Sequence, residues 1–320
     1  MNSIRLPLSL LDFRFDCEDA RRLPAFPGSA WRGALGWSLK RTVCVIRDTA
    51  CRDCLLYRSC LFPYVFETPP PPDAEKLRKY PAAPHPFVLR IAPGQTGPDY
   101  RLGLVLIGRA CSQLPYFVHA LSEAGRHGIG SQRQPFQLRE IQQAGGGDLD
   151  TWSCIYERDG ALASLAVNSP EPPACPEQVR LRLTAPLRLK REDHLVTPAT
   201  FRFADLFGSL LRRVSLLTYF HTEHPLEADF AGLVQRANDV ALHDPRLRWY
   251  DWTRYSSRQD AALDMGGLIG EVTLEGADLA EFWPYLWLGQ WVHAGKGATL
   301  GLGRYQLESI IGGHPDALGA

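Results

Sequence analysis

A glycine-rich loop between a helix and a strand is expected twice in this chain, and the repetition limits the folds available to it. The loops span residues 125–133 and 293–304, and Gly130 lies 173 residues before Gly303. The expected flanking helix and strand are Ser112–Ala124 and Phe136–Ile141 for the first loop, and Leu279–Gln290 and Arg304–Ile311 for the second. A repeat at this distance predicts two similar domains side by side.

The second loop has the composition of a phosphate-binding segment. Four glycines fall within the nine residues Gly295–Gly303. They can expose backbone N–H groups and let the main chain approach a polyanion. Lys296 and Arg304 add cations, Thr299 adds a hydroxyl, and His293 adds an imidazole. It is not a Walker loop, because no Gly-Lys-Ser/Thr closes it. The alternative is a glycine-rich turn between a helix and an edge strand.

Each half of the chain shows the order strand, helix, strands, helix, strand. This order is that of a ferredoxin-like βαββαβ domain. We therefore expect an α+β protein with two tandem ferredoxin-like domains, the first carrying a cysteine-rich metal loop. The expected bounds are 1–147 for the first domain, 148–176 for a hairpin and linker, and 177–320 for the second domain.

Charge and hydrophobicity narrow the classes of function. Acidic and basic residues balance at 35 each, which argues against a surface made for non-specific nucleic-acid binding. The basic residues are 30 Arg and five Lys. Arg suits bidentate phosphate contacts and base stacking, although a GC-rich genome gives the same bias. No apolar run approaches the roughly 20 residues of a membrane span. We expect a cytoplasmic protein with no membrane partner.

Four of the eight cysteines cluster as Cys44-x6-Cys51-x2-Cys54-x5-Cys60. Thiolates from two short loops can close a tetrahedral site, so the spacing predicts a bound metal, with structural zinc favoured and an iron–sulfur cluster as the alternative. The scattered cysteines are expected to be free thiols. They are Cys17, Cys111, Cys154 and Cys175.

Several motifs together resemble one family. In the second half they are 187–191, 252–259, 266–270 and 293–305, and in the first half 28–36, the cysteine loop before Phe66-Glu67, and 128–130. These segments resemble the CRISPR-associated endoribonucleases that cut precursor crRNA, the sixth Cas family of the RAMP superfamily. The resemblance covers nearly the whole chain.

The resemblance implies two tandem ferredoxin-like domains that hold CRISPR repeat RNA on glycine loops and basic residues. It also implies metal-independent cleavage, in which the 2′-OH attacks the adjacent phosphate and leaves a 2′,3′-cyclic phosphate. Such a reaction needs a base, an acid and cations for the phosphorane charge. No cofactor is then expected for catalysis, so the cysteine site would be structural. crRNA and other Cas subunits are the expected partners, and retention of the product stays open.

One departure concerns the catalytic base. Relatives often place a histidine on or just after the first helix, where this chain has Trp37. Some members without that histidine use arginines, so the catalytic candidates are Arg32, Arg41 and His293. The RNA-binding candidates are Gly295, Lys296, Gly297, Thr299, Gly301, Gly303 and Arg304 in the second loop, Arg126, His127 and Arg133 in the first, and Arg188, Lys190 and Arg191 on a basic strand. For His127 and His293, a hydrogen bond that orders the loop is the alternative.

A second function remains open. The same superfamily includes non-cleaving subunits that bind crRNA as a scaffold, and the missing histidine on the first helix would suit such a protein. A metal-dependent nuclease is disfavoured, because no cluster of Asp and Glu has the form of a two-metal site.

Overall fold

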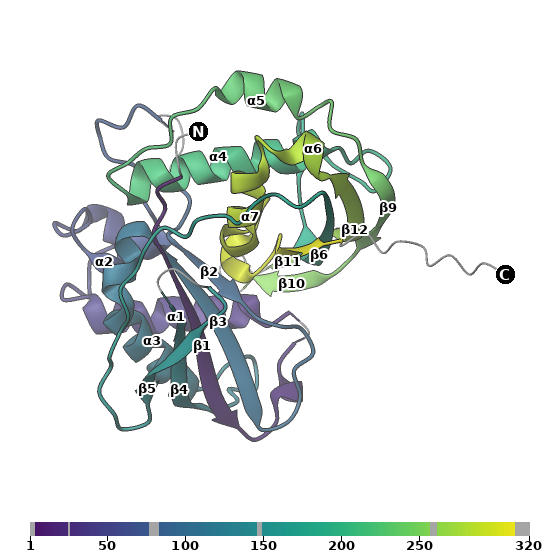
Figure 1. Ribbon diagram of the computed structural model, residues 1–320. Helices are drawn as coiled ribbons and strands as arrows, with labels where there is room; N and C mark the ends of the chain where they lie inside the picture. Colours follow the sequence, from purple (N-terminus) through teal and green to yellow (C-terminus); the bar gives the residue numbers. More distant parts are fainter. Residues whose placement is uncertain (1–3, 25, 77–82, 146–148, 257–260, 311–320) are drawn as a thin grey trace. The chain divides into compact units, whose positions relative to one another are not determined.

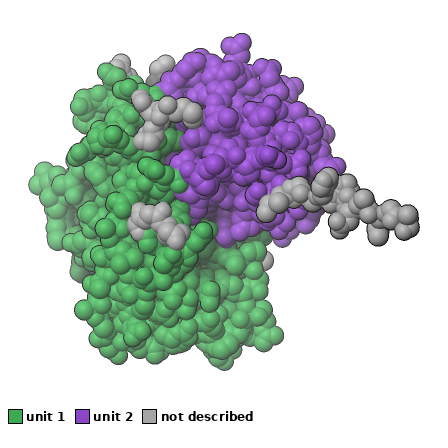
Figure 2. All heavy atoms as spheres, in the orientation of Figure 1, with its two compact units in different colours: residues 1–171, 212–227, 298–301 green, residues 172–211, 228–297, 302–320 purple. Residues whose placement is uncertain are grey.

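The structure is a computed structural model that describes residues 4–24, 26–76, 83–145, 149–256 and 261–310. Residues 257–259 of the motif 252–259 and residue 311 of the expected last strand lie outside these ranges. The chain forms two compact units, coloured separately in Figure 2. Unit 1 contains residues 1–171, 212–227 and 298–301, and unit 2 contains residues 172–211, 228–297 and 302–320.

Unit 1 is built on an antiparallel sheet of five strands in the order β2-β3-β1-β4-β5 (Figure 1). Its central strand pairs with β3 from Leu8 opposite Ile107 to Asp16 opposite Asp99. The strands are β1 (Leu8–Cys17), β2 (Phe87–Arg90), β3 (Asp99–Ile107), β4 (Phe136–Ala144) and β5 (Trp152–Glu157). The helical elements are η1 (Ala20–Arg22), α1 (Gly28–Val43), η2 (Cys51–Asp53), α2 (Leu61–Phe66), η3 (Gly108–Gln113) and α3 (Leu114–His127).

Helix α1 forms because its apolar residues recur at helical spacing. Trp31, Leu35 and Leu39 are all fully buried and belong to the core that the sheet shares with α3. The Trp31 indole donates a hydrogen bond of 3.0 Å to the hydroxyl of Tyr100 on β3. The predicted first helix is confirmed, and its remaining face is left for polar and aromatic residues.

Unit 2 is built on an antiparallel sheet of four strands in the order β13-β6-β12-β9. The strands are β6 (Gln178–Leu187), β9 (His243–Tyr250), β12 (Gly267–Glu275) and β13 (Tyr305–Ser309), with two hairpins, β7 (Lys190–Arg191) with β8 (His194–Leu195) and β10 (Thr253–Ser256) with β11 (Ala261–Asp264). In the chain, the helical elements between these strands are α4 (Phe203–His221), α5 (Phe230–Arg236), α6 (Gly276–Leu279), α7 (Trp283–Val292) and η4 (Ala298–Leu300). Residues 212–221 of α4 and all of η4 belong to unit 1.

The two sheets share one connection pattern. If strands are numbered within each sheet and β5 is left aside, both run 2-3-1-4, with helices between strands one and two and between strands three and four. The expected α+β class is confirmed, and both sheets are antiparallel.

Two elements differ from what the local sequence predicts. The apolar run at residues 62–66 predicts a short strand, but these residues belong to helix α2, whose early Pro63 is tolerated because the first N–H groups of a helix need no intrahelical partner. The pattern at residues 230–242 predicts one helix, but helix α5 ends at Arg236, and the Asn238 side chain donates to the carbonyls of Val234 and Gln235. In the described ranges, no helix combines the length and apolar character needed to cross a bilayer.

Candidate nucleic-acid interface and catalytic groups

The loop after α7 contains glycines that no other residue could replace without strain. Gly303 has φ +68°, and a Cβ there would lie 1.8 Å from the Ala294 oxygen. Gly295 has φ +71°, and its Cβ would lie 2.6 Å from the Arg188 oxygen. Both contacts are far inside van der Waals distance, so these glycines set the path of the chain.

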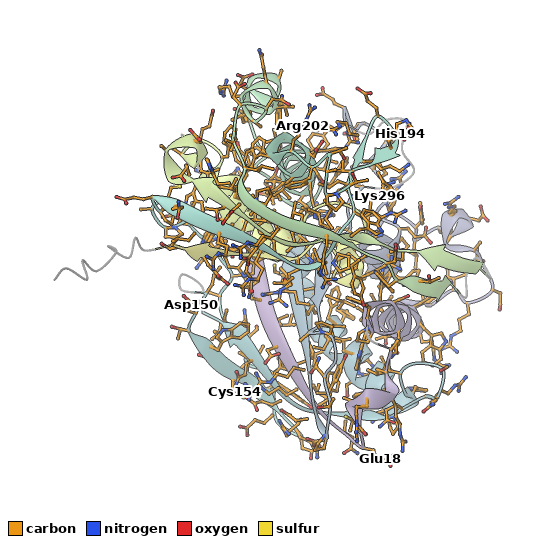
Figure 3. All side chains as sticks on the ribbon, turned by 90° about the vertical axis from the view of Figure 1, so that its right-hand side faces the viewer. Glu18, Asp150, Cys154, His194, Arg202 and Lys296 are labelled. Atoms are coloured by element: carbon orange, nitrogen blue, oxygen red, sulfur yellow. The ribbon has the colours of Figure 1, made fainter. Side chains whose placement is uncertain are left out.

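Most backbone donors of this loop are used within the protein. The N–H of Gly295 donates to Ser209 Oγ at 3.0 Å, and the N–H of Lys296 donates to the Arg188 carbonyl at 3.1 Å. The N–H of Gly303 donates to the Pro186 carbonyl at 3.0 Å. The glycines therefore serve close chain packing, and the exposed Lys296 side chain carries the positive charge of the loop (Figure 3).

The tip of the loop belongs to unit 1. A Cβ on Gly28, at the start of α1, would lie 2.0 Å from the backbone oxygen of Leu300. A Cβ on Gly301, which has φ +89°, would lie 3.0 Å from the oxygen of Leu89 on β2. The tip is thus seated directly on the first turn of α1 and on the edge strand of the five-stranded sheet.

The loop after α3 is a tight turn closed by a two-residue bridge. Ile129 and Gln134 exchange backbone hydrogen bonds of 2.8 and 3.1 Å. Gly128 has φ +91°, and a Cβ there would lie 2.1 Å from the Arg133 oxygen. Arg133 is exposed at the turn, with φ +48°. The repeated sequence pattern thus corresponds to a constrained, solvent-facing turn that displays an arginine.

Ion pairs divide the basic candidates into two groups. One group is engaged by acidic side chains: Arg126 with Glu123 at 2.6 Å, Lys190 with Asp193 at 3.7 Å and Arg191 with Asp205 at 3.3 Å. Arg188 donates instead to the Gly266 carbonyl at 3.0 Å. Among the residues that the structure describes, no acidic side chain pairs with Arg41, Arg133 or Lys296. Arg304 is partly buried, and burial lowers its pKa.

Arg32 points into unit 1. Its Nη2 lies 3.4 Å from Nε2 of His85, and its guanidinium lies 5.2 Å from the ring centre of Phe66. The other His85 nitrogen, Nδ1, lies 2.7 Å from the Thr68 hydroxyl. Burial, and then the charge of Arg32, lowers the pKa of His85 to about 3. Arg32 thus helps to hold a neutral, enclosed imidazole.

A second enclosed imidazole lies in unit 1, on α4. Nε2 of His221 lies 2.7 Å from the Pro84 carbonyl, and Nδ1 lies 3.2 Å from the Tyr64 hydroxyl. Burial lowers the pKa of His221 to about 4. Nothing in the sequence distinguishes His85 or His221, since their partners come from positions far apart in the chain.

His293 is fully buried. It has φ +60°, and its Nδ1 lies 3.0 Å from the Leu302 carbonyl across the glycine loop. Because a carbonyl can only accept, Nδ1 carries the proton. A hydrogen bond that orders the loop was the alternative to a catalytic role for His293, and the observed contact has this geometry.

Three candidate positions meet on the exposed face of unit 1. The guanidinium of Arg41 lies 4.6 Å from the ring centre of Trp37, one turn earlier on α1. The imidazole of His127, at the end of α3, meets the same indole edge-on with 4.9 Å between ring centres. Trp37 is 46% exposed, and the His127 side chain is 50% exposed. Trp37 stands at the position where the family resemblance implies a histidine, and the structure places the histidine of another helix, His127, against it.

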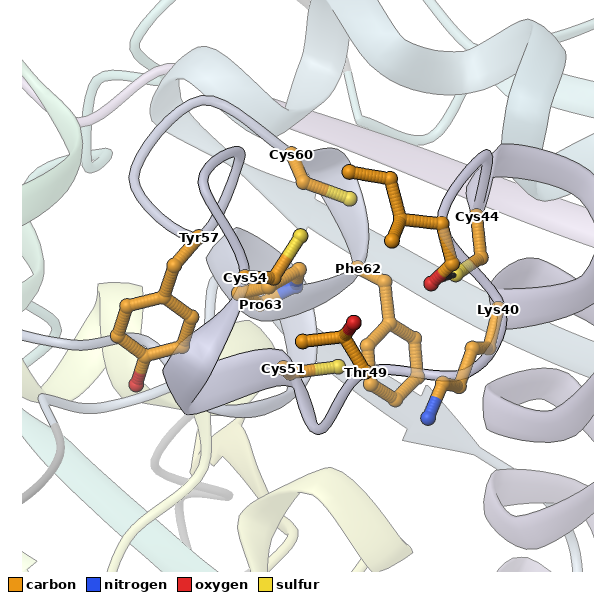
Figure 4. Close-up of a pocket in the computed structure, with 10 residues that line it drawn as sticks. Lys40, Cys44, Thr49, Cys51, Cys54, Tyr57, Cys60, Phe62 and Pro63 are labelled. Carbon is orange, nitrogen blue, oxygen red and sulfur yellow. Dashed lines mark hydrogen bonds between the residues drawn. The ribbon is translucent and has the colours of Figure 1, made fainter.

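The four clustered cysteines line one small pocket beside Lys40 and Phe62, with a volume of about 20 Å³ (Figure 4). Its walls come from short turns, in which the N–H groups of Tyr57 and Cys60 donate to the carbonyls of Cys54 and Leu56. The sequence spacing therefore identified a real cluster. Its members are Cys44, Cys51, Cys54 and Cys60.

The predicted metal at this cluster is not supported. Within the described part of the chain, no group of three or more His, Cys, Asp or Glu side chains is arranged to hold a metal ion. The thiol of Cys44 turns to the Ile46 carbonyl at 3.2 Å, and burial raises the pKa of Cys51. Structural zinc and its alternative, an iron–sulfur cluster, are therefore not shown, and the four cysteines are free thiols in this structure.

Comparison with protein families gives two matches. Residues 6–167 match the family model named AF_1859_N, an N-terminal domain, and residues 181–305 match the model described as CRISPR-associated endoribonuclease Cas6. No curated protein matches the chain.

Solved structures share the fold. A product complex of Cas6 from Thermus thermophilus is similar with a TM-score of 0.57 at 16% identity, covering 93% of this chain and 98% of that one. The same Cas6 in another structure gives 0.52 at 16% identity, with 96% and 100% covered. A partial Cas6-RT-Cas1–Cas2 complex gives 0.57 at 15% identity, covering 98% of this chain and 48% of that one. At these identities the likeness concerns the fold.

Proposed function

Since the chain belongs to the Cas6 family of CRISPR-associated endoribonucleases, we propose that it cuts CRISPR repeat RNA in precursor crRNA. The observation that carries the proposal is the Cas6 model match over residues 181–305, which contains the glycine loop, helix α7 before it and the first residue of strand β13 after it. The likeness to Cas6 structures over more than nine-tenths of the chain supports it at the level of the fold.

The chemistry is a transesterification within the RNA. The 2′-OH loses its proton and attacks the adjacent phosphorus, the bond to the 5′-oxygen breaks, and the products are a 2′,3′-cyclic phosphate and a 5′-OH. Because the RNA supplies the nucleophile, the reaction needs in addition a proton acceptor, a proton donor and cationic groups. We propose that no metal takes part in these steps.

Among the arginines, we assign the cationic role to Arg41. It is exposed, and the ring of Trp37 supports its guanidinium, whereas Arg32 faces His85 and Phe66. A guanidinium at the surface can donate hydrogen bonds to the phosphate oxygens as negative charge develops on them. We assign a positioning role to Arg32 and a loop-ordering role to His293.

RNA would be held by the cations without acidic partners, above all Lys296 and Arg133. The glycines at 295, 297, 301 and 303 would shape the loop that presents Lys296 and Thr299. The remaining contributors we propose are Arg126, His127, Arg188, Lys190, Arg191 and Arg304. By analogy with the product complex of the Thermus thermophilus protein, we further propose that the cut RNA stays bound.

We also propose two tandem ferredoxin-like domains, spanning 1–147 and 177–320 with a linker at 148–176. The shared strand order of the two sheets supports this. Other Cas proteins are proposed partners, because a Cas6 fold is part of a Cas6-RT-Cas1–Cas2 complex among the similar structures.

The second candidate is a crRNA-binding scaffold that does not cut. Trp37, on the helix where relatives carry the catalytic histidine, is the observation that favours it. The test is incubation of the full chain with repeat RNA in EDTA. A defined cut that leaves a 2′,3′-cyclic phosphate supports the endoribonuclease, and a substrate with a 2′-deoxy nucleotide at the cut should then stay intact. Binding without a cut supports the scaffold.

A further inference from the structure

His127 has the form of a proton acceptor held ready at the protein surface. Its Nδ1 lies 2.8 Å from the backbone oxygen of Glu123, one turn earlier on α3. A carbonyl oxygen only accepts hydrogen bonds, so Nδ1 carries the ring proton. The lone pair of the neutral ring is therefore on Nε2, away from the helix backbone.

The surroundings of this ring suit a nucleotide. Trp37 contacts the imidazole edge-on and is itself 46% exposed, which leaves indole surface on which a base can stack. On the same indole, 4.6 Å from its centre, lies the Arg41 guanidinium, a donor for phosphate oxygens. A stacking surface, a cation and an imidazole with a fixed tautomer thus come from two helices of unit 1.

The other histidines are less suited to accept a proton from RNA. His85, His221 and His293 are enclosed, with ring nitrogens directed at Thr68 and Arg32, at Pro84 and Tyr64, and at Leu302. The exposed histidines are His119, His194, His224 and His243, and in the described chain no aromatic side chain contacts their rings. His127 alone of these combines exposure with an aromatic and a cationic neighbour.

We propose that His127 is the general base of the cleavage reaction, an assignment that rests on the proposed function. Nε2 takes the proton of the 2′-OH as the 2′-oxygen forms its bond to phosphorus and the bond from phosphorus to the 5′-oxygen breaks. The leaving 5′-oxygen takes a proton from water, and the imidazolium returns its proton to solvent. The base reaches the site from α3, while α1 supplies Trp37 and Arg41.

The charged group that faces the ring is Glu123 on α3, whose carboxylate is 3.9 Å from Nδ1. Two arginines lie one contact further away. Arg126 is paired with Glu123 at 2.6 Å, and Arg41 lies over the indole of Trp37. The carboxylate is therefore near the proton-bearing nitrogen of the ring, Nδ1.

The experiment is single-turnover cleavage of repeat RNA in EDTA, at saturating protein, by the parent, His127→Asn, His127→Ala and His119→Asn. Asn at 127 retains an N–H donor for the Glu123 oxygen but no base, so a purely structural role would be rescued by it. We expect both His127 variants to cut about 100- to 10,000-fold more slowly. Their affinity for RNA should fall by no more than about tenfold, the effect of one lost hydrogen-bonding contact. His119→Asn, on the same helix, should cut at the parental rate.

Two further measurements distinguish a general base at position 127 from other roles of this residue. In acid, where a base must first lose a proton to act, the parental rate should rise about tenfold per pH unit, and this dependence should be absent from His127→Asn. A substrate with sulfur at the 5′-bridging position needs no acid for its leaving group, and the defect of His127→Asn should persist with it.

Recovery on the sulfur substrate would identify His127 as the acid and overturn the proposal. Parental rates in His127→Asn would overturn it while leaving the endoribonuclease in place. A parent that binds repeat RNA but never cuts it would overturn both.

Discussion

Gly28 has no room for a side chain, because a Cβ there would lie 2.0 Å from the backbone oxygen of Leu300. We expect Gly28→Ala to displace the loop tip and to lower the free energy of unfolding by about 1–3 kcal/mol. Gly33 is the matched control on the same helix, since a Cβ there meets nothing within 4 Å. Gly33→Ala should raise stability by roughly 0.5–1 kcal/mol. Denaturant unfolding measures both, and equal effects would contradict this account of the tip.

Acid should weaken the fold through His85 and His221. Their pKa values fall from 6.5 to about 3 and about 4 in the folded chain, so at intermediate pH the unfolded chain binds more protons. Their contribution is complete above pH 6.5 and is lost as the pH falls toward those lower values, by roughly 2 kcal/mol each at pH 4.5. The measurement is the free energy of unfolding at pH 7 and 4.5 for the parent, His221→Asn and the exposed control His224→Asn. A pH dependence as steep in His221→Asn as in the parent would refute the assignment for His221.

Lys296 should contribute one phosphate contact. With Lys296→Ala, the slope of log K against log salt for repeat RNA should become shallower by about 0.7 to 0.9. Arg202→Ala, an exposed change in unit 2 outside the predicted RNA-binding set, should leave the slope unchanged. Fluorescence anisotropy over a range of salt concentrations gives both slopes. Identical slopes for Lys296→Ala and the parent would remove Lys296 from the interface.

Replacement of the two arginines of α1, Arg32 and Arg41, by alanine should have different effects. Arg41→Ala should lower the single-turnover rate about 100- to 1,000-fold, because a donor to the developing phosphorane charge is lost. The free energy of unfolding of this variant should fall by no more than about 1 kcal/mol, the value of an exposed cation–π contact. Arg32→Ala should lower the free energy of unfolding by about 1–3 kcal/mol, because its contacts with Phe66 and His85 are lost. A rate loss confined to Arg32→Ala at full stability would reverse the two roles.

Thiol reactivity should follow burial. Burial raises the pKa of Cys17 to about 11 and of Cys111 to about 12, so little thiolate is present at pH 8. Iodoacetamide should therefore alkylate the exposed Cys154 of the native protein well before either of them. Peptide mass spectrometry over time measures the order, and early labelling of Cys111 would contradict its burial.

The sequence predicted the periodic parts of this protein best. Trp31, Leu35 and Leu39 recur at helical spacing, so helix α1 could be expected from local pattern alone. The segment 62–66 was wrongly expected to be a strand, because five apolar residues fit either structure until packing decides.

The candidate site was harder to predict, because its geometry depends on contacts distant in sequence. Spacing found the four cysteines of one pocket but could not show how their sulfurs are turned. Likewise, the contact of Trp37 with His127 joins residues on two helices and leaves no local signal. The glycines were recognised, but their role in close chain packing appears only from the contacts that a Cβ would make.

The common strand order of the two sheets also bears on ancestry. A single βαββαβ module that was copied and fused would give both halves the same connections, with a glycine turn before the last strand of each. The later differences between the two copies would then lie in a few inserted segments. One copy gained the cysteine segment after its first helix, and the other gained two hairpins, β7–β8 and β10–β11. The turns at Gly128 and Gly303 are on this view descendants of one ancestral turn, so each offers a template for redesigning the other.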